Sequence, residues 1–587
     1  VAVLNSTNLA ALSSVQVQAL TTAQIVGLTT KQISDLNTVT LQALSAKQIT
    51  ALETGDVSLL GSSKITSLNS TQVRALTTAQ IVELTTAQLS SLGSSILSGL
   101  QSSQMSALST DRLNNLASTT LSGLSSSQVA GLTTVQVASL ATTALGYLST
   151  AAITGLNTSQ IVAMTTAQLS SLSTTNIQVM SGAQLGALEQ GDFAILGDKL
   201  NVLSSTQVRG LTTTQVAGLS TADVANLNTK AVAGLSTAQI AALTTAQAAG
   251  LTSTAVKALT SAQMAAMQTA DLAALSTSNL AALSSVQVQA LTTAQIVGLT
   301  DTQITNMNTV TLQSLTVKQV AVLETSDIVS LGSTKVTSLS STQLRAMNTA
   351  QIAALTTAQL GSLGASQLNL LKAEQLLGVN SSKLNDLSSD ILRALTAVQV
   401  AGLTTTQLTG LNSAAVANLS SSAIGGLTTK QVTAFTTTQI ANLTSTSLAG
   451  FTTTQIAAME TADVAALTSA SIAALNSNQV QALTSTQIVA LTTAQISNLE
   501  TTTLQALTVK QVAALETSDI TLLGSSKITA LSSAQLKALT TAQVAGLTTA
   551  QLNSMGSTQI SQLKADQLPA LSTTTLNQLD ANALGGL

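Results

Sequence analysis

Large apolar residues recur at every eighth position of the chain. Steps of eight from Leu4 reach Leu at nearly every stop up to Leu196, and a second series runs from Leu203 to Leu587. We number this residue position 1 of an octad; position 6 is then Ile, Val or Leu in almost every unit. All nine Met and all three Phe also fall at position 1 or 6, so we predict that these two positions form the core.

This period fits neither a strand nor one long helix. Positions 1 and 6 have opposite parity, so in a strand they would face opposite sides. In a continuous helix, eight residues advance about 800°, and the apolar stripe would drift by about 80° per octad. The octad must therefore contain its own break.

The polar positions of the octad predict where that break lies. In LTTAQIVG, Thr21 stands at position 2 and Gln24 at position 5, which is the spacing of a helix N-cap and its capping box. Leu20 and Ile25 then occupy the two positions of a hydrophobic staple. The next octad repeats the arrangement with Leu28, Thr29, Gln32 and Ile33.

We therefore predict an all-α fold, a superhelical solenoid of very short capped helices, with one helix over positions 3 to 8 of each octad. Helices this short are marginal alone in water, so stacking must stabilise them. One octad does not fix the number of helices per superhelical turn, for which we take about three. A Gly at position 8, as at Gly27 and Gly155, suggests a left-handed helix exit. Pro569, at position 7, predicts a distorted or 3₁₀-like unit.

The rival fold is a β-solenoid, because Thr, Val and Ile favour strands. It would require period-2 alternation or regular turn signals, and neither is systematic here.

The register divides the chain into three parts. Residues 1–195 follow the first register, residues 196–202 form a seven-residue unit that we expect to be a local irregularity, and residues 203–587 follow the second register. We interpret all three as one continuous repeat domain.

A longer repeat overlies the octads. LETGDVSLLGSSKI begins at Leu52, and related stretches begin at Leu188, Leu323 and Leu515. In three copies an Asp and a Lys occupy position 5 of successive octads; these are Asp56 and Lys64, Asp327 and Lys335, and Asp519 and Lys527. We expect exposed ion pairs between neighbouring helices, worth about 0–1 kcal/mol each. The functional alternative is a cation site or a lateral contact point that recurs along a fibre.

Composition argues against most chemistry. The chain has no His and no Cys, which removes imidazole and thiolate ligands and the Ser-His-Asp triad, and its acidic residues show no recurring catalytic pair. We therefore expect no enzymatic activity, no cofactor and no metal. Charged residues are 7%, the net charge is −3 and aromatic residues are 1%, which disfavours nucleic acid as a partner. No run of about 18 apolar residues predicts a transmembrane helix.

The octads LTTTQVAG at 211–218 and LTTAQIVG at 291–298 resemble the repeat tracts of very large bacterial surface and secreted proteins, often described as adhesin-like exoproteins. The resemblance covers essentially the whole chain. It implies an extracellular or cell-surface location and a filament, stalk or sheath role, and it carries over no binding residues.

Our leading hypothesis is a structural subunit or segment of a bacterial extracellular filament, sheath or surface layer. We expect end-to-end or lateral self-association through a neutral Ser/Thr/Gln surface, since few surface charges weaken repulsion. Two alternatives are the stalk of a giant adhesin, attached to the cell through other parts and presenting a separate binding domain, and an ice-binding Thr array.

Overall fold

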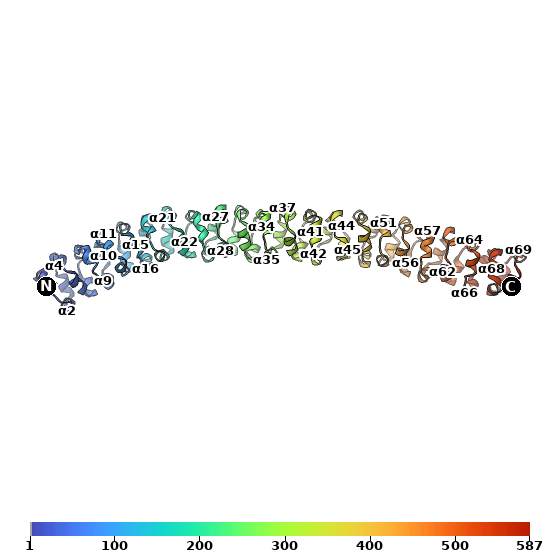
Figure 1. Ribbon diagram of the computed structural model, residues 1–587, viewed down its shortest axis with the longest axis horizontal. Coiled ribbons are helices and arrows are strands. Elements are labelled where there is room, and N and C mark those ends of the chain that lie inside the picture. The colour runs from blue at the N-terminus through green and yellow to red at the C-terminus, as the bar shows by residue number, and fades with distance from the viewer. Residues whose placement is uncertain (1–2) are drawn as a thin grey trace. The chain divides into compact units, whose positions relative to one another are not determined.

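A computed structural model describes residues 3–587, and within them the chain is all-helical without strands (Figure 1). It contains seventy α-helices, α1 to α70, and two 3₁₀ helices, η1 (Gly197–Val202) and η2 (Leu568–Ala570). The predicted all-α solenoid is confirmed. The helices form two compact units, the first ending at Leu299 and the second beginning at Thr300.

Each octad forms one helix, which begins at position 3 and ends at position 6, 7 or 8. Examples are α2 (Ser14–Ala19), α3 (Thr22–Val26), α4 (Thr30–Asp35), α5 (Thr38–Ala43) and α6 (Ala46–Ala51). Among the α-helices, α41 (Gly332–Ser338) and α45 (Gly364–Leu368) begin at position 2, and α68 (Thr549–Ile560) joins two octads across a kink at Gly556. Where a helix extends to position 8, it usually stops because the position 1 residue turns extended, as Leu20 does with φ −63° and ψ 133°.

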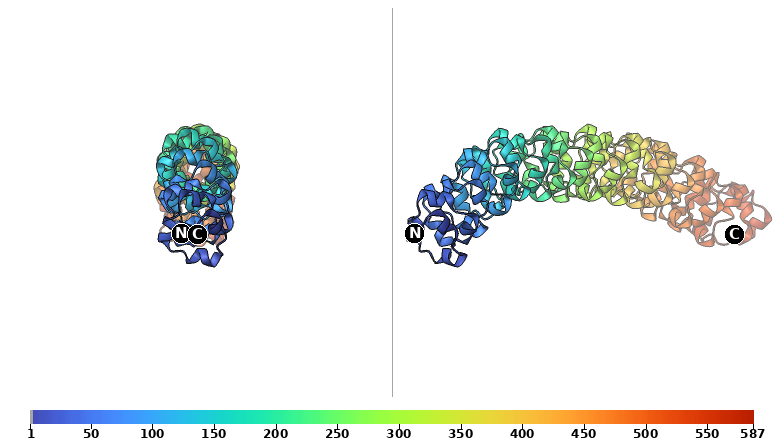
Figure 2. Two further views of the ribbon diagram at one scale, coloured as in Figure 1. Left: turned by 90° about the vertical axis from the view of Figure 1, so that its left-hand side faces the viewer. Right: turned by 60° about the vertical axis from the view of Figure 1, so that its left-hand side comes forward.

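Three octads make one turn of the superhelix within each unit. The strongest contacts between helices join a helix to the third helix after it, so α2 contacts α5 and α3 contacts α6. In the second unit, α54 (Thr437–Ala441) contacts α57 (Thr461–Ala466) and α57 contacts α60 (Ser485–Val489) in the same way. Figure 2 shows this turn-on-turn stacking of short helices within each unit.

The core of each unit is the continuous column of position 1 and position 6 side chains. Ile25, Ile33 and Val73 at position 6 are fully buried, and the position 1 residues Leu36 and Leu44 are nearly so. Ala248 takes position 6 in its octad and is also fully buried. Apolar burial is therefore distributed evenly along each unit. Each Å² of apolar surface removed from water stabilises the fold by about 25 cal/mol.

The seven-residue unit is absorbed inside the first unit by a change of helix type. Residues 197–202 form η1, and a 3₁₀ helix rises about 2.0 Å per residue against 1.5 Å in an α-helix. Fewer residues therefore cover the same path. η1 still packs against α22 (Thr174–Val179) before it and α27 (Thr221–Asn226) after it, so the count of three helices per turn is kept.

The unit that contains Pro569 is distorted as predicted. Residues 568–570 form η2, which places Pro569 in a short 3₁₀ turn that needs no amide from it.

The glycines at position 8 do not form left-handed exits, which corrects our expectation. Gly27 has φ −77° and Gly155 has φ −76°. The role of Gly155 is close packing between turns, because a Cβ there would lie 2.2 Å from the carbonyl oxygen of Ser126, one turn earlier. The recurring Gly at position 8 does mark a structural constraint, but that constraint is close packing against the neighbouring turn.

Positive φ angles occur instead at some position 2 glycines, and nearly identical octads differ. In LGSTKV, Leu331 is helical and Gly332 has φ +72°. In LGSSKI, Leu523 is extended and Gly524 has φ −64°. A Cβ would meet nothing within 4 Å at either glycine. Backbone conformation alone therefore distinguishes them.

Replacing each of these glycines with Ala should have different effects. We expect G332A to raise the rate of tryptic cleavage after Lys335 in the native protein about fivefold, because a left-handed residue with a Cβ costs about 1 kcal/mol. G524A should leave cleavage after Lys527 unchanged or slow it, since Ala restricts the unfolded chain. Equal effects at the two sites would contradict the assigned backbone conformations.

Candidate functional site

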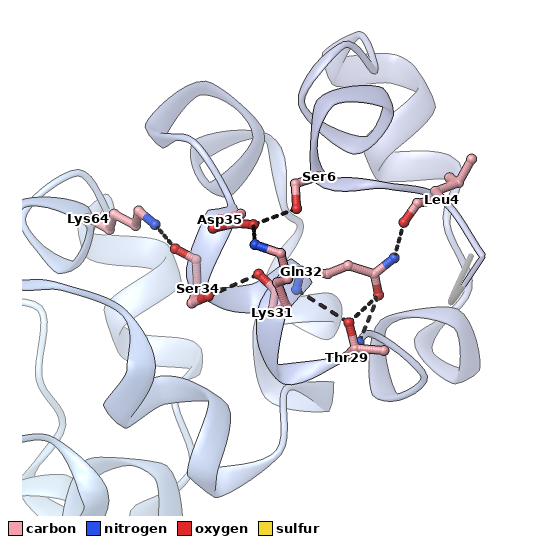
Figure 3. Close-up of polar contacts among 8 residues, drawn as sticks. All are labelled: Leu4, Ser6, Thr29, Lys31, Gln32, Ser34, Asp35 and Lys64. Carbon is pink, nitrogen blue, oxygen red and sulfur yellow. Dashed lines mark hydrogen bonds and ion pairs between the residues drawn. The ribbon is translucent and has the colours of Figure 1, made fainter.

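The candidate site is a repeated polar feature that begins at the helix N-cap. Thr21 and Gln24 form a capping box in α3, and Thr29 and Gln32 form one in α4. In the second box, Thr29 donates from its backbone N to Gln32 Oε1 at 2.8 Å, and Gln32 donates from its backbone N to Thr29 Oγ1 at 3.3 Å (Figure 3). Of the four predicted staple residues, Ile25, Leu28 and Ile33 are buried and Leu20 is half-buried.

The glutamine of the box also binds the previous turn of the superhelix. Gln32 Nε2 donates to the Leu4 carbonyl at 2.5 Å (Figure 3). Further along, Gln160 Oε1 accepts from Asn157 N at 2.7 Å, while its Nε2 donates to the carbonyls of Val129 at 2.9 Å and Leu132 at 2.6 Å. We call these position 5 side chains and their carbonyl partners the position 5 ladder.

The ladder supplies a further donor to carbonyls at the end of a short helix. Val129 lies in the last turn of α16 (Ser126–Ala130), and its carbonyl also accepts from Leu132 N at 3.1 Å. Gln160 is 1% exposed, so water does not compete for this bond. The same pair of bonds, to residues 31 and 28 positions back, recurs in both units at Gln48, Gln72, Gln80, Gln343, Gln431 and Gln543.

The ladder resumes after the one-residue deletion with a shifted interval. Gln207 and Gln215 donate to carbonyls 30 and 27 positions back, and Gln239 returns to intervals of 31 and 28. The partner is therefore set by the three-helix turn and not by a fixed sequence interval.

The expected ion pairs between Asp56 and Lys64, Asp327 and Lys335, and Asp519 and Lys527 do not form, which corrects the prediction. Lys64 Nζ donates to the Ser34 carbonyl, Lys335 Nζ to that of Thr305, and Lys527 Nζ to that of Ser497. The aspartates face their own N-caps. Asp56 Oδ2 accepts from Glu53 N at 3.1 Å, and Asp327 and Asp519 accept from Glu324 N and Glu516 N at 2.8 Å. Each side chain is thus already bound to backbone.

Asp and Lys divide the two roles of the glutamine amide between successive octads. Asp keeps the acceptor that caps its own helix, and Lys keeps the donor that reaches the previous turn. An amide carries both groups on one side chain, whereas a carboxylate only accepts and an ammonium only donates. These three Asp octads therefore lack the amide's bond to a carbonyl of the previous turn.

Burial shifts the pKa of these three position 5 aspartates. Desolvation raises the pKa of Asp56, Asp327 and Asp519 above the ordinary value, and the adjacent Glu at each N-cap raises it further, while the backbone hydrogen bond to the cap opposes this.

The exposed Asp35 shows the opposite behaviour. Ser6 Oγ donates to Asp35 Oδ2 at 2.6 Å and Lys31 Nζ donates to the same oxygen at 3.0 Å, which together lower the pKa of Asp35 (Figure 3).

Sequence reasoning found the capping half of each glutamine and missed the half that joins turns. A signal for the second role was present. Gln104, Gln375 and Gln567 keep position 5 although Gln101, Lys372 and Lys564 replace the capping hydroxyl. All three donate to carbonyls 31 and 28 positions back.

Replacing Gln160 with Glu tests the ladder. The carboxylate keeps an acceptor for Asn157 N and loses the donor to Val129 and Leu132. We expect local opening of α16 and α20 (Thr158–Val162) to become easier by about 1–3 kcal/mol at pH 7, because two buried carbonyls lose the amide donor. Hydrogen exchange read by mass spectrometry measures this.

The matched control is Q178E, which makes the same charge change on an exposed glutamine. Its exchange pattern should equal that of the unaltered protein. Equal protection of α16 in Q160E and Q178E would show that the inter-turn bonds contribute nothing.

None of the helices in residues 3–587 combines the length and the apolar character needed to cross a bilayer. Comparison with curated proteins gives no match. Among solved structures, "Structure of APUM23-GGAUUUGACGG" aligns with 84% of this chain and 83% of its own, at 10% identity and a TM-score of 0.12. A likeness at that score supports no inference.

The model of the ALTTAQ repeat matches nine segments of the chain. They are residues 1–38, 49–86, 194–229, 216–253, 232–269, 264–301, 320–357, 456–493 and 512–549. The family's letters stand as ALTTAQ at residues 75–80, where Thr77 and Gln80 form a capping box and Gln80 binds the previous turn. The matched segments together cover half of the residues of the chain. The chain therefore belongs to the ALTTAQ repeat family.

Proposed function

We propose that the chain is a structural repeat segment of an extracellular or cell-surface assembly in bacteria, a filament, sheath or surface layer whose copies associate through neutral side chains. The observation that carries this proposal is the position 5 ladder. An added octad with Gln at position 5 repeats the same cap, the same buried pair and the same bonds to the previous turn, so extension requires no new interaction. Such a unit suits a protein whose task is to span distance.

The outward positions of the octads support self-association. Positions 3 and 4 are mostly exposed and carry mainly Thr, Ser, Ala and Val, and charged residues are 7% of the chain. Six valines at position 4 are 65–75% exposed: Val15, Val39, Val135, Val286, Val310 and Val398. Weak charge repulsion together with isolated apolar contacts favours lateral packing of one copy on another.

The extracellular location rests on the likeness of the octads to repeat tracts of large bacterial surface proteins. A low charge density and a Ser/Thr-rich surface fit that setting. The cap hydroxyls of Thr29 and its equivalents accept backbone bonds, so they serve the fold before any surface role.

Lysines placed on the exposed valines should weaken self-association. V15K/V39K/V135K should raise the concentration at which assemblies form at least tenfold, because each valine that a neighbouring copy covers contributes on the order of 1 kcal/mol. Sedimentation across a concentration series measures this, with electron microscopy to show the form of the assemblies.

A79K/S103K/A183K is the matched control, since it adds the same charge at exposed position 4 sites without removing an apolar group. Both triple variants bring the net charge from −3 to neutral, so charge alone cannot separate them. Protein that stays monomeric at every concentration, or equal weakening by both variants, would refute the proposed apolar lateral contact.

A further inference from the structure

Asp271 and Asp463 stand at position 5 of their octads and are 2% exposed. In each, Oδ2 is buried and has no hydrogen-bond partner. A buried carboxylate oxygen without a donor is costly, because it loses its hydration and gains nothing in return.

Both aspartates occupy position 5, the position that elsewhere carries the amide donor of the ladder. Gln263, one octad before Asp271, donates from Nε2 to the Leu235 carbonyl, 28 positions back. The same interval leads from Asp271 to Leu243 and from Asp463 to Phe435. No hydrogen bond found among residues 3–587 brings a donor to either of these carbonyls. At both places the Asp carboxylate and the carbonyl 28 positions back are both acceptors, and the donor between them is missing.

No cation is available from the surrounding helices. Asp271 lies in α33 (Thr269–Ala274), which packs on α30 (Thr245–Gly250) and α36 (Thr293–Val297), and neither neighbour carries a titratable residue. Asp463 lies in α57, whose neighbours α54 and α60 carry none either.

The charged group nearest in sequence to Asp463 is Glu460, at the N-cap of α57. It adds like charge, which disfavours the ionised form of Asp463.

We propose that Asp271 and Asp463 are proton-dependent joints between turns, in which the protonated carboxyl donates its O–H to the carbonyl of Leu243 or Phe435. A proton fits better than a metal ion. Residues 3–587 contain no group of three or more acidic ligands, and calcium takes six to eight oxygens. A carboxylic acid also restores what the glutamine amide provides elsewhere, one acceptor for its own helix and one donor for the previous turn.

The direction of the pH effect follows from burial. Desolvation raises the pKa of both groups above 3.8, against the opposing hydrogen bonds from Thr245 at Asp271 and from the Glu460 backbone at Asp463. A raised folded-state pKa means that the joint contributes its full stability below 3.8 and loses it as pH rises through the folded-state value. The joints therefore tighten in acid and loosen towards neutral pH.

Hydrogen exchange of the full chain between pH 4 and pH 8 tests the proposal, with rates corrected for intrinsic pH dependence. Peptides over α30, α33, α54 and α57 should lose about threefold to tenfold in protection as pH rises, the range expected for one hydrogen bond. Peptides over Gln263 and Gln455, whose octads keep the amide, should show no such change.

The variants D271N and D463N separate the joint from other effects of acid. Asn is neutral, so each variant should lose the pH dependence at its own site and keep it at the other. D223N is the control, since Asp223 is also at position 5 but is half-exposed and accepts from Ser220 Oγ at 2.6 Å. Protection that does not change with pH in the unaltered protein, or an unchanged pH dependence in D271N, would overturn the proposal.

Discussion

A buried glutamine amide at position 5 joins the start of its own helix to the end of another helix one turn earlier. Its oxygen caps the helix on which it stands, and its nitrogen donates to two backbone carbonyls at the end of the earlier helix. A helix of five or six residues leaves most of its backbone groups unpaired, so this fold generates the need that the glutamine meets. Because each such bond lies in the interior, it is worth more than a bond exposed to water.

Variation at position 5 is therefore variation in the strength of the joint between turns. Gln supplies acceptor and donor, Lys527 supplies only the donor, and Asp519 only the acceptor. Asp271 and Asp463 are the extreme cases of this variation, since one carboxylate oxygen of each has no hydrogen-bond partner in the interior. A chain of nearly identical octads can in this way hold local differences in stability and in response to protons without changing its fold.

The remaining constraints are steric, and they also arise between turns. A position 8 residue lies against a position 3 residue of the previous turn, and Gly155 leaves no room there for a Cβ. Near-identical octads still take two backbone forms at Gly332 and Gly524. The repeat thus tolerates local differences in backbone conformation. As in other solenoids, each octad is stabilised by burial against its neighbours and not by its own helix propensity.

The sequence by itself determined the helices, the position at which most of them begin, the core and the caps. Those features depend on residues within one octad, such as Leu28, Thr29, Gln32 and Ile33, and short-range spacing is readable. Only the tertiary structure decided which octads touch, because near-identical units offer no pattern that singles out the third neighbour. For the same reason it alone revealed the second bond of Gln32, the packing role of Gly155 and the backbone partners of Asp56 and Lys64, which lie about 30 residues away or replace an expected ion pair.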